Sequence, residues 1–113
     1  MYEILILPRF LREVKKYIKK YPALKEELIV FLEKFRKEES ISLGNNVYKL
    51  RFKSKLFPKG SSKSFRLIVF FLEVDNILAP AFFYYKGDKE NITKKELNDR
   101  LEEIFIYLKS LNL

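Results

Sequence analysis

The 113-residue chain has no cysteine and no histidine, and these two absences exclude several kinds of site. Without cysteine there is no disulfide framework and no thiolate-bound metal, which fits a reducing cytoplasm. Without histidine there is no Ser-His or Cys-His catalytic pair and no imidazole-bound metal. Any chemistry must therefore come from other side chains.

Glycine and proline are also scarce, at three and four residues, so linker-like and collagen-like readings are excluded. Long apolar runs are missing too. The longest uncharged stretch outside the basic block described below is Asn76 to Tyr85, which is too short to span a bilayer and contains a proline. The apolar start, Tyr2 to Leu7, carries Glu3 and lacks the basic start and cleavage site of a secretory signal. We therefore expect a soluble, cytoplasmic protein with no membrane partner.

Apolar material is abundant: 48% of the residues are hydrophobic and 16% are aromatic. A chain of this length can bury one core but not two, so we expect a single domain over residues 1–113. Tyr2 to Leu7 predicts a short strand. Pro8 suits the first turn of a helix. That helix is predicted from an apolar stripe of Leu11, Val14 and Ile18, with Tyr17 and Tyr21 alongside. A second helix after Pro22 is predicted from Leu24, Leu28, Phe31, Leu32 and Phe35.

From Tyr48 the pattern changes to a period of two, which predicts a strand. Its apolar positions (Tyr48, Leu50, Phe52, Leu56) alternate with cations (Lys49, Arg51, Lys53, Lys55). The preceding "SLGNN" indicates a turn. Residues 65–74 predict a central strand interrupted by Arg66. Residues 77–86 predict another strand, in which Pro80 requires a sheet edge or a bulge.

The last element is predicted to be a helix that begins after Thr93, because Thr93 and Glu96 have the spacing of a capping box. Its apolar positions are Leu97, Leu101, Ile104, Leu108 and Leu111. This spacing fits a coiled-coil seam or a helix that covers a sheet, and the second is commoner for so short a segment. The order of elements predicts an α+β fold: an N-terminal strand and helical hairpin, a mainly antiparallel sheet of about four strands, and a C-terminal helix.

Positive charge is concentrated in one third of the sequence. The formal net charge is +8, and Ser40 to Leu72 contains seven cations and no carboxylate. The rest of the chain holds 16 basic and 15 acidic residues, so it is almost neutral. A concentrated basic block favours a polyanion site, although a solvated basic face has the same pattern.

The remaining reactive groups suit a phosphodiester. Cleavage of RNA by its own 2′-hydroxyl needs a base, cations around the developing phosphorane and a proton for the leaving oxygen. Arginine matches phosphate geometry, and lysines crowded by like charges exchange protons more readily near neutral pH. The carboxylates lie mostly on the predicted helices, so neither a metal site nor a paired-carboxylate hydrolase is supported. The catalytic candidates are Lys49, Arg51, Arg66, Lys89, Tyr84 and Tyr85. The candidates for binding RNA are Lys53, Lys55, Lys59, Lys63 and Lys86.

Three segments, "YKLRFK", "KGSSKSFRLIVFF" and "FFYYKGDKENIT", resemble the RelE/ParE superfamily of type II toxins, especially its RelE-like and HigB-like members. The likeness covers most of Tyr48 to Thr93, and the order of elements matches over the whole chain. By position, Lys49 and Arg51 correspond to the family's basic strand pair, and Arg66 to its phosphate-contacting arginine. Lys89 falls near a further basic catalytic position.

The sequence departs from the family pattern at two places. Ser62 and Ser64 stand where a glycine pair is usual. The C-terminal catalytic tyrosine of RelE has no clear match, so Tyr84 and Tyr85 are only stand-ins for it.

The resemblance implies a ribosome-dependent endoribonuclease that cleaves mRNA without a metal or other cofactor. It also implies an acidic cognate antitoxin as partner, together with the ribosome and mRNA, and leaves a homodimer open. Two other functions fit the same sequence: a ParE-like inhibitor of DNA gyrase, and a non-catalytic module that binds nucleic acid.

Overall fold

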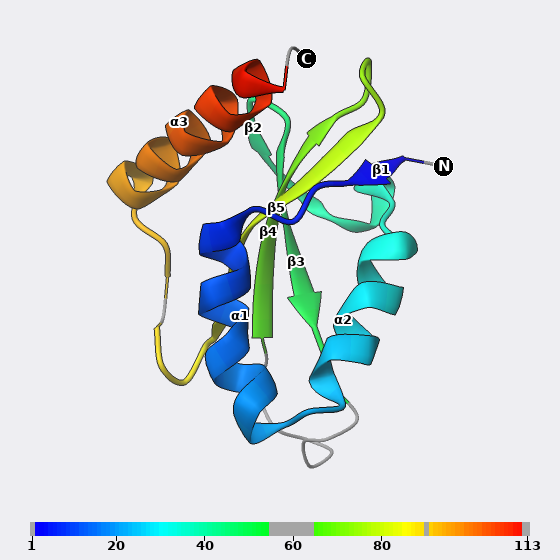
Figure 1. The fold of residues 1–113 in the computed structure, drawn as a ribbon, viewed down its shortest axis with the longest axis vertical. Coiled ribbons are helices and arrows are strands. Elements are labelled where there is room, and N and C mark those ends of the chain that lie inside the picture. The colour runs from blue at the N-terminus through cyan, green and yellow to red at the C-terminus, as the bar shows by residue number, and fades with distance from the viewer. Residues whose placement is uncertain (1, 55–64, 90, 112–113) are drawn as a thin grey trace.

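The structure is a computed structural model that describes residues 2–54, 65–89 and 91–111. Within these ranges the chain forms an α+β fold, as predicted (Figure 1). The elements in chain order are β1 (Glu3–Ile4), α1 (Pro8–Lys20), α2 (Leu24–Glu33), a 3-10 turn (Lys37–Glu39), β2 (Ile41–Gly44), β3 (Val47–Phe52), β4 (Phe65–Leu72), β5 (Ile77–Tyr85) and α3 (Lys94–Ser110).

The described strands form one sheet in the order β1-β5-β4-β3-β2. The neighbours from β2 to β5 are antiparallel, and β1 is parallel to β5. The sheet thus has five strands rather than about four, because part of the predicted turn "SLGNN" belongs to β2. Only Asn45 and Asn46 form the turn, with φ of 52° and 64°, which is the geometry of a two-residue hairpin. β2 is an exposed edge strand, so it has no alternation of apolar and polar residues to reveal it.

Two predicted elements differ in detail from the structure: the N-terminal strand is shorter, and the first helix buries a different face. The N-terminal strand is limited to Glu3 and Ile4, which pair with Ile77 and Leu78. In α1 the buried stripe is Phe10, Val14 and Tyr17, whereas Leu11 is 42% exposed. The helix is therefore turned by about one residue from the predicted orientation, because the ring of Phe10 buries more surface than Leu11 would.

Pro80 lies at a bulge, which was one of its two predicted settings. Ile68 pairs with Phe82 and Val69 pairs with Pro80, so Ala81 is an additional residue in β5. Pro80 has no N–H to give to the ladder, and a bulge tolerates that loss.

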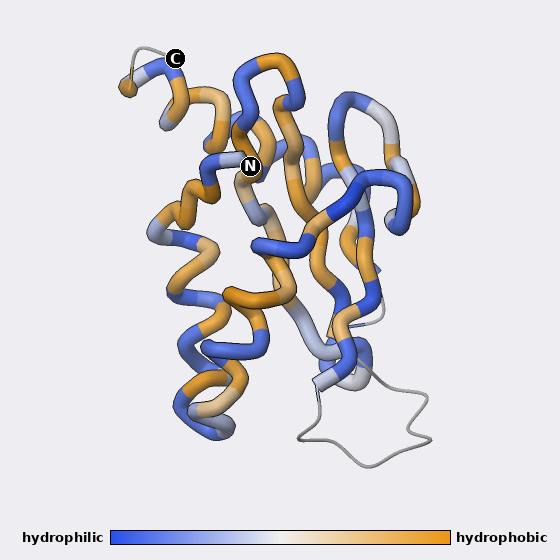
Figure 2. The backbone as a smooth tube through the Cα atoms, turned by 90° about the vertical axis from the view of Figure 1, so that its right-hand side faces the viewer, coloured by the Kyte–Doolittle hydropathy of each residue, from blue (hydrophilic) through white to orange (hydrophobic). Residues whose placement is uncertain are grey.

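Each face of the sheet carries its own core, and the helices are divided between the faces. α1 and α2 pack on one face against residues such as Phe52, Phe65 and Phe83. α3 packs on the other face, where Leu101 and Ile104 join the core. Figure 2 shows the apolar segments running along the strands and alternating with polar segments along the helices. None of the helices in the described ranges is both long and apolar enough to cross a membrane.

The start of α3 confirms the predicted capping box. The Thr93 hydroxyl accepts from the Glu96 N–H, and the Glu96 carboxylate accepts from the Thr93 N–H, each at 3.1 Å. Leu101, Ile104 and Leu108 are buried against the sheet, so α3 is a sheet-covering helix. Leu111 is the C-cap residue and is 44% exposed, so it is not part of this core.

A buried cation links α3 to the rest of the fold. Arg100 is 6% exposed, and its guanidinium group donates two hydrogen bonds, of 2.9 and 2.5 Å, to the Glu13 carboxylate of α1. It also donates to the carbonyl of Ala81 at the bulge and lies 4.0 Å from the ring centroid of Phe82. β1 pairs with β5 only at Ile77 and Leu78, so the Ala81 carbonyl lies beyond that pairing. Arg100 gives this carbonyl a hydrogen-bond partner.

We predict that Arg100→Met destabilises the protein by about 2–4 kcal/mol, because it leaves the Glu13 carboxylate and the Ala81 carbonyl without this partner. Urea unfolding followed by circular dichroism measures the change. Arg9→Met is the matched control, since Arg9 binds Glu103 with its side chain 53% exposed. That variant should cost less than about 1 kcal/mol. Equal losses in the two variants would contradict a special role for Arg100.

Candidate functional site

The register of three strands places basic residues and a tyrosine in one row. Arg51 on β3 pairs with Arg66 on β4, and Arg66 pairs with Tyr84 on β5. Side chains of directly opposite residues point to the same face of a sheet. Tyr84 belongs to the core on the α3 face, so all three lie on that face. Lys49, two residues before Arg51, points the same way.

Lys86 lies close enough to this row for its positive charge, like that of Arg66, to lower the pKa of Lys49. We call Lys49, Arg51, Arg66, Tyr84 and Lys86 the basic cluster. It lies at the end of the sheet where β5 leads into the turn before α3. The structure therefore brings together five of the residues that the sequence singled out.

The cluster has a buried floor and an exposed rim. Arg66 and Tyr84 are each 6% exposed, whereas Arg51 and Lys86 are exposed and Lys49 is intermediate. The Arg66 guanidinium donates a long bond of 3.5 Å to the Phe65 carbonyl. The Lys49 ammonium donates to the side-chain carbonyl of Asn91 at 3.3 Å. The basic cluster thus combines exposed cations with a buried guanidinium group and a buried phenol.

The pKa of Lys49 lies below its ordinary value. Burial is the main cause, and the positive charges of Arg66 and Lys86 add to it. Each of these effects disfavours the ammonium form. A larger fraction of Lys49 is therefore in the amine form near neutral pH than of a solvated lysine.

The hydroxyl of Tyr84 is buried beside the cations. Among the described residues it is the one buried side-chain oxygen or nitrogen without a hydrogen-bond partner. Burial raises the pKa of Tyr84, the charge of Arg66 lowers it, and the charge of Glu96 raises it. A phenol that stays protonated beside a guanidinium group can donate to an anionic oxygen.

Lys89 lies near the start of α3 and is paired. Its ammonium binds the Glu96 carboxylate at 2.7 Å, and this bond is the main reason that the pKa of Glu96 is lowered to about 2. Hydrogen bonds from the backbone and hydroxyl of Thr93 lower it further. The structure thus ties Lys89 to the first turn of α3 through a carboxylate.

Tyr85 lies on the opposite face of the sheet from the basic cluster. Its ring packs on Phe65 with centroids 5.5 Å apart, in the core beneath α1 and α2. Its backbone N–H donates to the Tyr17 hydroxyl at 3.2 Å. The structure therefore places Tyr84, and not Tyr85, beside Arg66.

The other predicted binding lysines are distributed differently. Lys53 follows the end of β3 and is exposed. Lys55, Lys59 and Lys63 lie outside the described residues. Asn91 and Glu96 contact predicted site residues but were not predicted as site residues. The capping motif was the one signal for Glu96, and it did not indicate the contact with Lys89.

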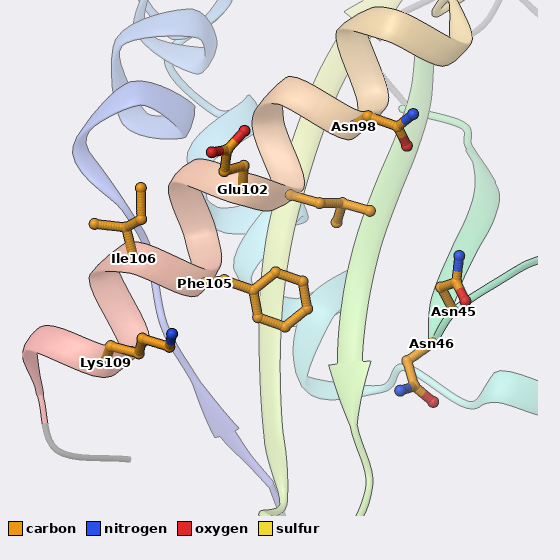
Figure 3. Close-up of a pocket in the computed structure, with 8 residues that line it drawn as sticks. Asn45, Asn46, Asn98, Glu102, Phe105, Ile106 and Lys109 are labelled. Carbon is orange, nitrogen blue, oxygen red and sulfur yellow. The ribbon is translucent and has the colours of Figure 1, made fainter.

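The described residues contain no group of three or more carboxylates that could hold a metal ion. One cavity on the α3 face, of about 680 Å³, lies between α3 and the turn before β3 (Figure 3). Its described lining includes Asn45, Asn46, Asn98 and Phe105, and none of the residues of the basic cluster. It therefore lacks the charge density of that cluster.

Comparison with solved structures identifies the fold. A mutant of the Escherichia coli toxin RelE in the free state matches with a TM-score of 0.50, covering 79% of this chain and 87% of that chain at 17% identity. The chain has the RelE-like toxin fold. No family model matches the sequence, and no curated protein matches it either. The expected RelE-like architecture is therefore confirmed from the structure.

We predict that Lys86→Gln raises the pKa of Lys49, because it removes one of the positive charges that disfavour the ammonium form. The pKa should stay below its ordinary value, since burial and Arg66 remain. A titration followed by NMR of the lysine side chains measures it. Lys53→Gln is the control and should leave the pKa of Lys49 unchanged. An equal effect of both variants would show that Lys86 has no particular influence on Lys49.

Proposed function

We propose that the chain is the toxin of a type II toxin-antitoxin pair and that it cleaves mRNA on translating ribosomes in the cytoplasm. The observation that carries the proposal is the row of Lys49, Arg51, Arg66 and Tyr84 on one face of the sheet. The RelE-like fold supports it. An acidic antitoxin would hold such a protein inactive, and the formal net charge of +8 is complementary to one.

The proposed reaction uses the 2′-hydroxyl of the RNA. Lys49 in its amine form takes the hydroxyl proton, and the 2′-oxygen attacks phosphorus. The bond from phosphorus to the 5′-oxygen breaks, which leaves a 2′,3′-cyclic phosphate. The 5′-oxygen then takes a proton from a cluster cation or from water. These steps need no metal, because protein side chains take and return the protons and supply the positive charge beside the phosphorane.

Arg66, Arg51 and Tyr84 stabilise the phosphorane in this proposal. Arg66 contributes the charge of its guanidinium group from the buried floor, where that charge acts more strongly than in water. The Tyr84 hydroxyl donates to one phosphoryl oxygen. Arg51 on the exposed side contacts an adjacent phosphate. Lys89 is held by Glu96, so we assign it to positioning the turn before α3.

We predict that Arg66→Ala abolishes growth arrest and lowers mRNA cleavage by about 10²–10³-fold, because it removes the main charge at the phosphorane. Growth in cells and mapping of cut sites, with and without ribosomes, measure the loss. Arg66→Lys keeps the charge but not the planar fork, and should recover part of the activity. Circular dichroism verifies that both variants are folded.

Arg36→Ala is the control, because Arg36 is exposed and forms a weak surface ion pair with Glu39, 3.9 Å away. Cleavage by Arg66→Ala at the original rate would remove Arg66 from the mechanism. Growth arrest with gyrase inhibition and no cut RNA would assign the chain to the ParE-like alternative. RNA binding with neither effect would assign it to the non-catalytic alternative.

We also predict that Lys53→Gln and Lys86→Gln weaken ribosome association in a salt-dependent way, because both lysines are exposed: Lys86 belongs to the basic cluster, and Lys53 follows β3, the strand that carries Lys49 and Arg51. Each phosphate that is no longer neutralised by a lysine should reduce the slope of log affinity against log salt by about 0.7–0.9. Binding to purified ribosomes at several salt concentrations measures it. Lys95→Gln is the control, since Lys95 lies on α3 and binds Asp99. An unchanged slope in the first two variants would show that these lysines do not dock the ribosome.

A further inference from the structure

A second pocket lies on the opposite face of the sheet from the basic cluster, at the same ends of β4 and β5. Its volume is about 540 Å³, within the range of small-molecule sites. It is lined by Lys16, Tyr17, Lys20, Tyr21, Phe65, Tyr85 and Asp88. Phe65 and Tyr85 are the chain neighbours of Arg66 and Tyr84, so the two sites use adjacent residues of each strand on opposite faces of the sheet.

Cations and aromatic rings occur together in this pocket. The Lys16 ammonium lies 4.9 Å from the ring centroid of Tyr17, and the Lys20 ammonium lies 5.6 Å from that of Tyr21. Tyr21 and Tyr85 are partly exposed. Rings beside ammonium groups suit a nucleotide, because the base can stack on a ring and the phosphate can bind the cations.

The Asp88 carboxylate gives the pocket a hydrogen-bond acceptor. The Tyr17 hydroxyl donates to Oδ2 of Asp88 at 3.1 Å and accepts the Tyr85 N–H at 3.2 Å. Tyr17 is buried, so its hydroxyl holds one oxygen of the exposed Asp88 carboxylate from the core side. Lysines in the last turn of α1 also complement the helix dipole. That role explains the lysines alone and leaves the nearby carboxylate and rings unexplained.

The carboxylate selects among the bases. Guanine presents two adjacent donors, N1–H and the N2 amino group, which match the two oxygens of a carboxylate. Adenine and cytosine present one amino group, and uracil presents one ring N–H. A carboxylate oxygen bound by one hydroxyl still has acceptor capacity left.

We propose that this pocket binds a guanosine nucleotide of single-stranded RNA, with the base held between Asp88 and the tyrosine rings and the phosphate held by Lys16 and Lys20. Its biological role depends on the proposed cleavage of RNA, since it would hold a nucleotide near the one that is cut. Binding itself does not depend on cleavage, so the two proposals can fail separately.

Titration of the full chain with guanosine 5′-monophosphate, followed by NMR, tests the site. We expect shifts at Lys20, Tyr85 and Asp88, and tighter binding than for adenosine or uridine monophosphate. Asp88→Asn should weaken guanosine monophosphate binding by about tenfold or more and remove the preference for guanine. Lys20→Gln should weaken binding of all three nucleotides by similar factors. Inorganic phosphate should bind more weakly than any of them.

Asp75→Asn is the control for Asp88, because Asp75 is an exposed carboxylate in the turn before β5. Arg66→Ala should lose RNA cleavage and keep guanosine monophosphate binding, which supports the pocket whether or not the chain proves to be a nuclease. Equal affinity for the three nucleotides in the wild type would overturn the proposal. So would binding that is lost in Arg66→Ala and unaffected by Asp88→Asn, because the nucleotide would then occupy the basic cluster.

Discussion

The candidate site depends on two like charges being held opposite each other. Arg51 and Arg66 form a direct cross-strand pair, and such pairs repel. The opposite face of the same strands supplies the compensating stability. There Phe52 pairs with Phe65, and Phe65 stacks on Phe83 with centroids 4.6 Å apart. A slip of one residue would expose these rings, so the aromatic core fixes the register and with it the row of cations.

Much of this arrangement follows from local patterns in the sequence. The alternation from Tyr48 to Phe52 predicted which face of β3 is basic, because the period of a strand is two. The position of Arg66, a lone cation in an apolar strand, singled it out as a candidate site residue. The capping box predicted the start of α3, and Pro80 predicted an edge or a bulge. Each of these signals involves residues within a few positions of one another.

The features that were missed depend on contacts between distant segments. β2 is exposed, so no apolar pattern indicates it. The rotation of α1 that buries Phe10 in place of Leu11 is decided by packing on β5 and α2. The bond between Lys89 and Glu96 depends on how the chain turns between β5 and α3. The sequence also could not decide between Tyr84 and Tyr85. The bulge at Ala81 shifts the alternation of β5, and so it decides which of the two tyrosines faces α3.

That bulge has a consequence for how such a site could change over generations. Leu78 and Phe83 both face α1 and α2 although five positions separate them, since Ala81 breaks the strict alternation of β5. If one residue other than the bulged Ala81 were deleted from the strand upstream of Tyr84 and the bulge were kept, the phenol beside Arg66 would become that of Tyr85. The strand's length, as much as the identity of its residues, thus decides which hydroxyl meets the guanidinium. Aligning related chains by sequence letter alone would then equate tyrosines that occupy opposite sides of the sheet.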